Sequence, residues 1–153
     1  MEIRRAEPGD LPLMAKMGRY FHEISTYGKL QGYDEIRVQE SLLGGLDNPR
    51  TIFLVAWEEE KLAGLLLGCL NVNFYDPRET IAQCLFVAVF PEYQKKKVAS
   101  KLMKEFETWA MDNKANIIIY SGYSQSFIHA MKKKGFEQVE VTLMKRLDSA
   151  ISV

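Results

Sequence analysis

The residues with the clearest chemical potential lie where a strand-like apolar run gives way to a helical pattern. The run from Cys84 to Val89 is stopped by Pro91, and a short polar loop follows. Apolar residues then recur three to four positions apart, as on one face of a helix: Val98, Leu102, Phe106, Trp109 and Ala110. A loop between a strand end and a helix start directs free backbone N–H groups and the positive end of the helix dipole at one place. The sequence therefore predicts a phosphate or diphosphate site here.

This loop resembles the pyrophosphate-binding loop of the GCN5-related N-acetyltransferases. In that family the loop reads Arg/Gln-x-x-Gly-x-Gly/Ala and follows a Val-x-Pro-Glu-Tyr lead-in. The residues that fit the family pattern are Val89, Pro91, Glu92, Tyr93, Gln94, Val98 and Ala99. Lys97 departs from the pattern, because it stands where the family has its first glycine.

The resemblance implies a cofactor, acetyl-coenzyme A. Its pantetheine arm is expected along the backbone at Val87 and Val89, and its diphosphate is expected against the loop. The implied loop residues are Gln94, Lys95, Lys96, Lys97, Val98, Ala99 and Ser100. A glycine at position 97 would allow a close backbone approach or a positive φ, whereas a lysine adds a Cβ and a long side chain. The three lysines either supply positive charge for the phosphates or form a solvated charged run, and both interpretations stay open.

The group that deprotonates the amine has no obvious candidate. The resemblance places the family's carboxylate near Gln83 or Cys84, and neither an amide nor a thiol replaces a carboxylate at its ordinary pKa. Cys84 would act as a nucleophile only with a base such as His129 beside it. Its plainer interpretation is a buried apolar residue within a strand. A relayed water is therefore the expected base.

The group that protonates the leaving thiolate is equally open. Many family members end their last helix as Phe-Tyr-x-x-x-Gly-Phe, but here Ala130 and Met131 occupy the aromatic pair. A methionine has no proton to donate. Tyr120 and Tyr123, at the end of the preceding predicted strand, are the candidate substitutes, and each also fits a structural role as a strand-end or loop aromatic.

Hydrophobic periodicity predicts one domain with the element order β-α-α-β-β-β-α-β-α-β. The predicted strands span residues 1–6, 51–57, 62–74, 80–89, 117–120 and 136–144, and the predicted helices span 10–24, 34–46, 98–113 and 124–134. Interleaved helices and strands favour an α/β architecture with a mixed sheet covered on both faces. The acetyltransferase family has this order, that of the acyl-CoA N-acyltransferase fold, so the resemblance extends over nearly the whole chain.

Apolar side chains recur at helical spacing in the first two predicted helices and alternate along the last predicted strand. The inward residues of these two helices are predicted to be Leu13, Met14, Met17, Phe21 and Ile24, then Ile36, Leu42, Leu43 and Leu46. In the last strand Val139, Val141 and Leu143 alternate with polar residues, which is typical of a half-buried strand.

The composition is that of a folded protein. Of its 153 residues 47% are hydrophobic and 26% are charged. Twenty basic and twenty acidic side chains give zero net charge, which disfavours duplex nucleic acid and anionic membranes as partners. No apolar run reaches the ~20 residues of a membrane span, and the first residues lack a signal-peptide core. Two cysteines in strand-like runs and two separate histidines predict neither a disulfide nor a metal site, so the reducing cytoplasm is the expected location.

Two functions are compatible with these features. The first is an acetyl-coenzyme A-dependent N-acetyltransferase acting on a primary amine of a small molecule or a protein. The second is an inactive protein that keeps the acetyltransferase fold and binds another protein, which the departures at 83–84, 97 and 131 favour. Residues 21–28 and 82–86 also resemble phage and prophage members, for which a virion component or host-protein binder, in the virion or host cytoplasm, would be the role. Pairing of the chain with itself is left open.

Overall fold

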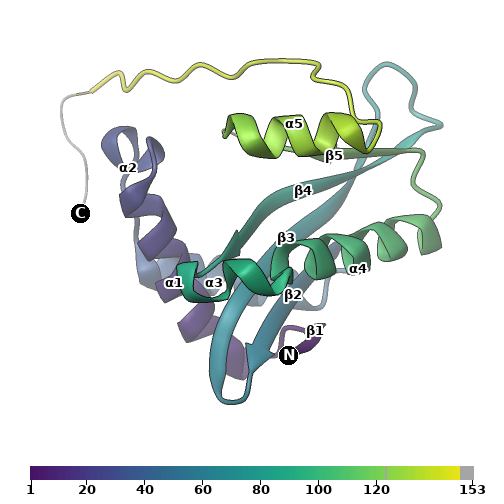
Figure 1. Ribbon diagram of the computed structural model, residues 1–153. Helices are drawn as coiled ribbons and strands as arrows, with labels where there is room; N and C mark the ends of the chain where they lie inside the picture. Colours follow the sequence, from purple (N-terminus) through teal and green to yellow (C-terminus); the bar gives the residue numbers. More distant parts are fainter. Residues whose placement is uncertain (123, 149–153) are drawn as a thin grey trace.

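A five-stranded sheet forms the centre of the computed structural model, which describes residues 1–122 and 124–148 (Figure 1). The strands are β1 (Glu2–Arg5), β2 (Thr51–Glu58), β3 (Lys61–Val72), β4 (Thr80–Val89) and β5 (Ile117–Tyr120). They lie side by side in chain order, and the pairs from β1 to β4 are antiparallel. β5 joins the edge of β4 in parallel orientation. This parallel step needs a crossover, which the chain makes through helix α4 (Val98–Asp112).

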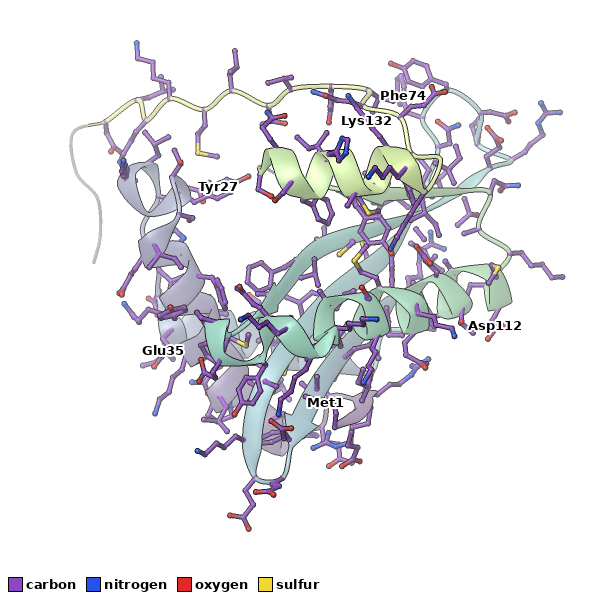
Figure 2. The ribbon with its side chains drawn as sticks, in the orientation of Figure 1. Met1, Tyr27, Glu35, Phe74, Asp112 and Lys132 are labelled. Carbon is purple, nitrogen blue, oxygen red and sulfur yellow. The ribbon has the colours of Figure 1, made fainter. Side chains whose placement is uncertain are left out.

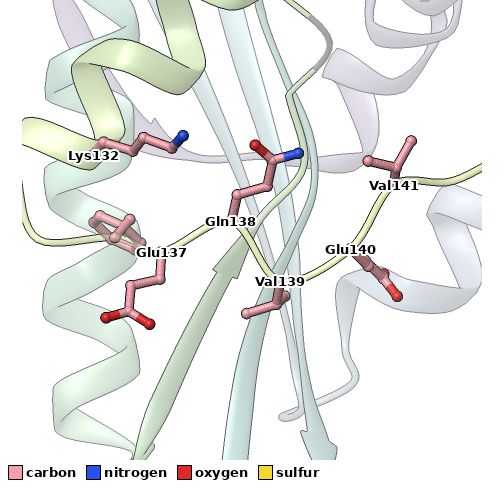
Figure 3. A pocket seen from close by; sticks show the side chains of 7 residues that line it. Lys132, Glu137, Gln138, Val139, Glu140 and Val141 are labelled. Atoms are coloured by element: carbon pink, nitrogen blue, oxygen red, sulfur yellow. The ribbon is translucent and has the colours of Figure 1, made fainter.

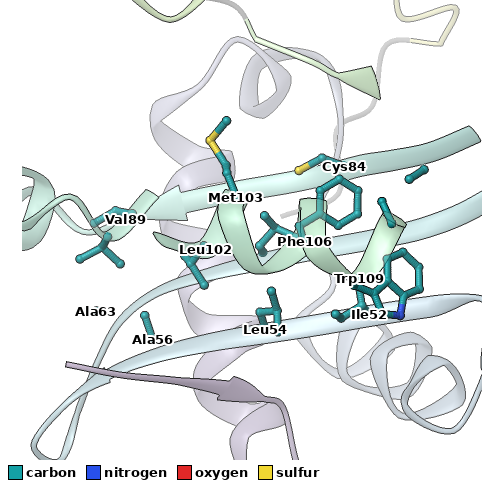
Figure 4. Close-up of a cluster of buried hydrophobic side chains, with 14 of the residues drawn as sticks. Ile52, Leu54, Ala56, Ala63, Cys84, Val89, Leu102, Met103, Phe106 and Trp109 are labelled. Carbon is teal, nitrogen blue, oxygen red and sulfur yellow. The ribbon is translucent and has the colours of Figure 1, made fainter. Parts of the chain in front are cut away.

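Helices cover both faces of the sheet, as the interleaved order predicts. On one face lie α1 (Leu11–Ile24) and α3 (Glu35–Leu46), with the short α2 (Tyr27–Leu30) between them in the chain. On the other face α4 forms the larger core, in which Leu102 and Phe106 are fully buried against the strands (Figure 4). Val98 is fully buried in the same core. Helix α5 (Gln125–Lys133) adds Met131 to this core. Within the described residues, no helix combines the length and apolar character that crossing a membrane requires.

Gly68 on β3 allows α4 to pack closely on the sheet. A Cβ at this position would lie 2.5 Å from Cε2 of Phe106 and 2.9 Å from its Cδ2. Phe106 is fully buried and cannot move aside. A glycine is therefore required here by the distance between helix and strand.

The sheet is irregular at the middle of β4. Leu67 of β3 pairs with Phe86, but the next residue, Gly68, pairs with Cys84, so Leu85 is the extra residue of a β-bulge. The bulge reverses the alternation of faces along β4. Ala82 and Cys84 face the α4 core before it, and Val87 and Val89 face the same core after it.

The N-terminal strand is attached to the start of the first helix by a partly buried ion pair. The guanidinium of Arg4 donates to both carboxylate oxygens of Asp10, at 2.6 and 3.0 Å. Asp10 also accepts from the backbone N–H of Glu7 at 2.8 Å, which caps the 3-10 turn η1 (Pro8–Asp10). The Arg4 guanidinium holds the pKa of the Asp10 carboxyl below its ordinary value.

The buried faces of α1 and α3 are narrower than predicted. Met14 and Met17 are buried as expected, and α1 also buries Leu11 and Ala15. Of the predicted inward residues of α3, Leu42 alone is fully buried. Four residues predicted to face inward are instead exposed: Leu13, Ile24, Ile36 and Leu43. The two helices contact the sheet along narrow stripes, and apolar residues beside those stripes remain in solvent.

The prediction of a strand over residues 136–144 is wrong. Phe136 turns inward, and its ring packs edge-on against Tyr120 with centroids 5.5 Å apart. Residues 137–147, called the C-terminal segment below, are extended but pair with no strand among the described residues. They pass on the outer side of α5, away from β5 (Figure 1). The alternating pattern is that of a strand, but the chain leaves α5 on the side where the sheet offers no edge.

Candidate functional site

The candidate site begins where β4 and β5 separate. The parallel pairing runs from Ile81 opposite Ile117 to Cys84 opposite Tyr120, and β5 ends there. β4 continues from Leu85 to Val89 with β3 on one side, and on the other side no strand of the described residues pairs with it. Its backbone N–H and C=O groups on that open side can therefore pair with an extended ligand. This is the stretch that contains Val87 and Val89, the predicted contacts of a pantetheine arm.

The open edge of β4 leads directly into the predicted phosphate loop. Pro91–Lys96 forms a 3-10 turn, η2, in which Tyr93 is buried and its backbone N–H donates to the carbonyl of Phe90. Lys97 follows with φ 58° and ψ 30°, the left-handed conformation. This is the conformation that a glycine would adopt without cost. Lys97 therefore gives the loop the local backbone shape that a glycine would allow.

The first turn of α4 supplies the free N–H groups. The first backbone hydrogen bond of the helix runs from the N–H of Lys101 to the carbonyl of Lys97, at 3.1 Å. The N–H groups of Val98, Ala99 and Ser100 precede this bond and have no acceptor within the helix. Val98 is buried and Ala99 half-buried, whereas Ser100 is exposed. The turn is thus anchored on its inner side and open to an anion on its outer side.

The loop's side chains divide into two groups. Lys96 forms an ion pair with Glu58 at the end of β2, and its Nζ lies 5.7 Å from the centre of the Tyr93 ring. Lys95 and Lys97 are exposed and have no ion-pair partner among the described residues. Gln94 donates from Nε2 to the carbonyl of Val89 at 3.4 Å, a long contact that ties the loop to the end of β4. The loop therefore offers two free cationic side chains and a third held by the β2–β3 hairpin.

Cys84 is a core residue rather than a nucleophile. It is 2% exposed within the α4 core, and burial raises the pKa of its thiol to about 12. His129, the base considered for it, is exposed on α5. A neutral buried thiol without a base does not attack a thioester.

Tyr120 is held against α4. Its hydroxyl lies 3.1 Å from the Glu107 carboxylate, to which it donates, and 3.5 Å from the carbonyl of Met103. Its ring packs edge-on against Phe106. Burial and the Glu107 carboxylate raise the pKa of the phenol, so it stays protonated. Tyr123, the other candidate acid, lies outside the described residues.

Two neutral amides lie near the point of separation, on the face of the sheet opposite α4. Nδ2 of Asn71 donates to Oε1 of Gln83 at 2.7 Å, which links β3 to β4. Cys69 pairs with Gln83 across the strands, and its Sγ lies 4.0 Å from Oδ1 of Asn71. Sequence reasoning noted Gln83 but missed the pair. The signal that could have revealed the pair is that Asn71 and Gln83 are polar residues within otherwise apolar predicted strands.

The connection between β3 and β4 displays two aromatic side chains at the edge of the molecule. Phe74 is 91% exposed and Tyr75 93% exposed, and Phe74 projects from the loop in Figure 2. Asn73 and Glu79 close the base of this loop by a side-chain hydrogen bond of 3.0 Å. In residues 1–122 and 124–148, no group of three potential metal-ligating side chains comes together.

Comparison with known proteins agrees with this architecture. Residues 17–137 match the model of the acetyltransferase (GNAT) family. No curated protein sequence matches the chain at a significant level.

Solved structures with the same fold share little sequence with the chain. A transcriptional regulator from Bacillus halodurans superposes with a TM-score of 0.77 at 16% identity, covering 95% of this chain and 99% of that one. The aminoglycoside 6'-N-acetyltransferase AAC(6')-IG from Acinetobacter haemolyticus gives 0.72 at 19% identity, covering 97% and 100%. Glucosamine-6-phosphate N-acetyltransferase from Arabidopsis thaliana gives 0.74 at 13% identity, covering 96% and 98%.

The resemblance to phage-encoded members stays a prediction, because none of these matches bears on it. The family match extends over most of the chain and includes β4, the loop and α4. The chain belongs to the GNAT acetyltransferase family.

Proposed function

We propose that this protein transfers the acetyl group of acetyl-coenzyme A to a primary amine. The observation that carries the proposal is the left-handed backbone at Lys97, set between the open edge of β4 and the first turn of α4. Because this position keeps the shape that a glycine provides, the departure from the family pattern does not disqualify the loop. Family membership supplies the reaction class.

The residues present fit the cofactor at three places. The backbone of β4 from Leu85 to Val89 can pair with the amide groups of a pantetheine arm. The N–H groups of Val98, Ala99 and Ser100 face the position of a diphosphate. Lys95 and Lys97 are exposed beside that position and can contribute positive charge. When bound, acetyl-coenzyme A supplies an activated thioester carbonyl for attack by the amine.

In this proposal the residues of the chain bind the cofactor and orient the amine, and they take little direct part in proton transfer. Near the separation point Cys84 stays a thiol, Tyr120 stays a phenol, and Asn71 and Gln83 are amides. The carboxylate there, that of Glu107, is engaged as the acceptor of the Tyr120 hydroxyl. The proton lost by the amine therefore passes to water, which the amide pair can help to hold. Transfer then depends on placing the amine next to the thioester, which alone lowers barriers substantially.

The acceptor is a primary amine of a small molecule or of a protein, and an assay must search both classes. Binding comes first, by calorimetric titration of the full chain with acetyl-coenzyme A and, separately, with coenzyme A. Release of free thiol is then measured with diamines, amino sugars and peptides carrying a free N-terminus. The proposal expects saturable binding and amine-dependent thiol release. It is overturned if no binding occurs at about 1 mM cofactor, where a Kd of that order would still give half-saturation.

A further inference from the structure

The direction from which an acceptor reaches the cofactor follows from what fills one face of the sheet. In the proposed function the pantetheine arm runs along β4 and ends at the point where β4 and β5 separate, beside Cys84 and Tyr120. On the α4 side this point is closed, because Cys84 is 2% exposed and the Tyr120 ring packs edge-on against Phe106. The amine therefore approaches from the face of the sheet opposite α4.

The face opposite α4 is open at this end of the sheet. Among the described residues, α1 and α3 cover it as far as the cross-strand pair of Leu67 and Phe86. Beyond that pair, the side chains next to Leu70, Ala82 and Ile118 lie on this face, since these three belong to the α4 core and strand side chains alternate. They are half-buried or exposed, belong to neither hydrophobic cluster, and are called the neutral strip below: Cys69, Asn71, Ile81, Gln83, Ile117 and Ile119. Gln83 and Ile119 are the cross-strand pair next to the separation point.

The neutral strip carries no ionised group. Three of its six side chains are isoleucines, and Nδ2 of Asn71 donates to Oε1 of Gln83 at 2.7 Å. Its thiol, that of Cys69, stays protonated, because burial raises the pKa of this group. In the adjoining β3–β4 connection, the carboxylates of Asp76 and Glu79 are engaged with other side chains of that loop. A cation on this face therefore meets no free carboxylate in the strip or in the loop.

A charge that borders the strip is itself cationic. The guanidinium of Arg50 donates to the carbonyl of Leu70 at 3.2 Å, on β3 between Cys69 and Asn71. A ligand with a second ammonium group would bring it toward this guanidinium, and the group would lose hydration without gaining an ionic partner. The strip therefore disfavours polycationic acceptors.

Apolar side chains border the strip where it meets α1. The ring centroid of Phe21 lies 6.3 Å from that of Phe86 and 5.7 Å from that of Phe90. Tyr20 packs against Phe21 at 5.0 Å and is 39% exposed. Leu85, the bulged residue beside Phe86, is 54% exposed. A ligand at the separation point therefore has apolar surface to contact both here and on the isoleucines of the strip.

A separate hollow differs from the strip in both place and chemistry (Figure 3). It measures ≈ 560 Å³, lies between α5 and the C-terminal segment, and is lined in part by Lys132, Glu137 and Glu140. This hollow is on the outer side of α5, away from β5 (Figure 1). An amine bound there would not reach a thioester on β4, so its carboxylates do not select the acceptor.

We propose that the acceptor is a primary monoamine with an apolar body, which lies on the neutral strip with its nitrogen at the separation point. The proposal rests on the acetyltransferase function proposed above. The neutral nitrogen attacks the thioester carbonyl, a C–N bond forms, and the C–S bond breaks. The amine proton passes to water, and the leaving thiolate takes a proton from water to give coenzyme A. Polyamines and aminoglycosides are poor acceptors, because their further ammonium groups find no carboxylate.

The test compares amines that differ in one property, with thiol release by the full chain as readout. Hexylamine and 1,6-diaminohexane differ in the second ammonium group, and kcat/KM should be at least about tenfold higher for hexylamine. From propylamine to octylamine kcat/KM should rise about threefold for each added methylene, because each one covers apolar surface. Glucosamine, a monoamine with a polar body, should be a poorer acceptor than hexylamine.

One substitution tests the place of binding. Gln83→Glu puts a carboxylate on the strip and keeps an acceptor for Asn71, so it should raise the ratio of kcat/KM for diaminohexane to that for hexylamine about tenfold. The ratio is unaffected by any general change of rate that a new carboxylate causes. Val72→Glu is the control, because Val72 is 57% exposed and alternation places it on the other face of β3. It should leave the ratio unchanged.

Calorimetric titration with coenzyme A separates two kinds of failure. If the chain binds coenzyme A and releases thiol, but uses diaminohexane or kanamycin as well as hexylamine, the acceptor proposal is overturned and the acetyltransferase function stands. If the chain does not bind coenzyme A, both are overturned. Equal ratios in Gln83→Glu and Val72→Glu would overturn the placement of the acceptor on the strip. The comparison of amines uses the unaltered chain, so it decides even where a substitution impairs folding.

Discussion

Substituting Ser100 by aspartate should stabilise the fold and weaken cofactor binding at the same time. Ser100 is exposed in the first turn of α4, so a carboxylate there buries nothing and faces the positive end of the helix dipole. The free energy of unfolding should rise by about 0.3–1 kcal/mol. The same carboxylate would lie beside the bound diphosphate, and repulsion at this partly screened position should cost about 1–3 kcal/mol of binding. That loss corresponds to a rise in Kd of roughly 5- to 150-fold.

The two effects are read in one experiment, chemical unfolding of the chain with and without coenzyme A. At a ligand concentration near 100 times the Kd, the unaltered chain should gain about 2.7 kcal/mol. If the Kd rises a hundredfold, the same concentration should add only about 0.4 kcal/mol. Ser41→Asp provides the control, since it adds the same charge to an exposed position of α3 on the opposite face of the sheet. Equal ligand stabilisation of Ser100→Asp and Ser41→Asp would refute the placement of the diphosphate at α4.

Four further changes test the rest of the structure. Lys97→Gly should raise the free energy of unfolding, measured in denaturant titrations, by about 1 kcal/mol, because glycine relieves the left-handed strain. Binding of coenzyme A should persist in this variant. Loss of binding would mean that the lysine charge is essential. Gly68→Ala should lower stability by about 1–3 kcal/mol through its clash with Phe106, whereas Gly44→Ala, with open space around it on α3, should raise stability by up to about 1 kcal/mol. The pKa of Asp10 is lowered in the folded state. Its contribution to the free energy of unfolding is therefore complete above the unfolded carboxyl pKa of ~4 and is lost as pH falls through the folded pKa. The difference in stability between the unaltered chain and Asp10→Asn should narrow below about pH 4. Tyr120→Phe removes the hydrogen bond to Glu107 and should lower stability by about 1 kcal/mol, while kcat stays within a few-fold of the unaltered value. A hundredfold loss of kcat would instead identify the phenol as the acid that protonates the leaving thiolate.

Much of the fold could be predicted because its strands are separated by clear breaks. The bounds predicted for β4 and β5 coincide with those observed, since Pro91 ends the apolar run of β4 and Ser121 and Gly122 end that of β5. The bulge at Leu85 could not be predicted. Nearly every residue from Ile81 to Val89 is apolar, so the sequence does not show at which residue the side chains switch from one face of the sheet to the other.

The C-terminal segment shows the limit of periodicity most clearly. Its alternation of Val139, Val141 and Leu143 with polar residues is what a strand requires, but alternation says nothing about whether an edge is within reach. That depends on which side of α5 the chain emerges, a property of helix packing. The buried faces of α1 and α3 were mispredicted at Leu13 and Ile36 for a related reason. Apolar spacing identifies a helix, but the width of its buried face depends on the surface that it meets.

The loop at Lys97 shows how a chain can hold a left-handed backbone without a glycine. A left-handed lysine costs about 1–2 kcal/mol relative to glycine. Tyr93 on one side of it and Val98 on the other are both buried, and a buried side chain of that size contributes about 1.5–3 kcal/mol each. Packing of the two flanking residues therefore outweighs the local strain. The direction of the N–H groups in the first turn of α4 follows from where β4 ends and where α4 packs, and it needs no glycine at residue 97.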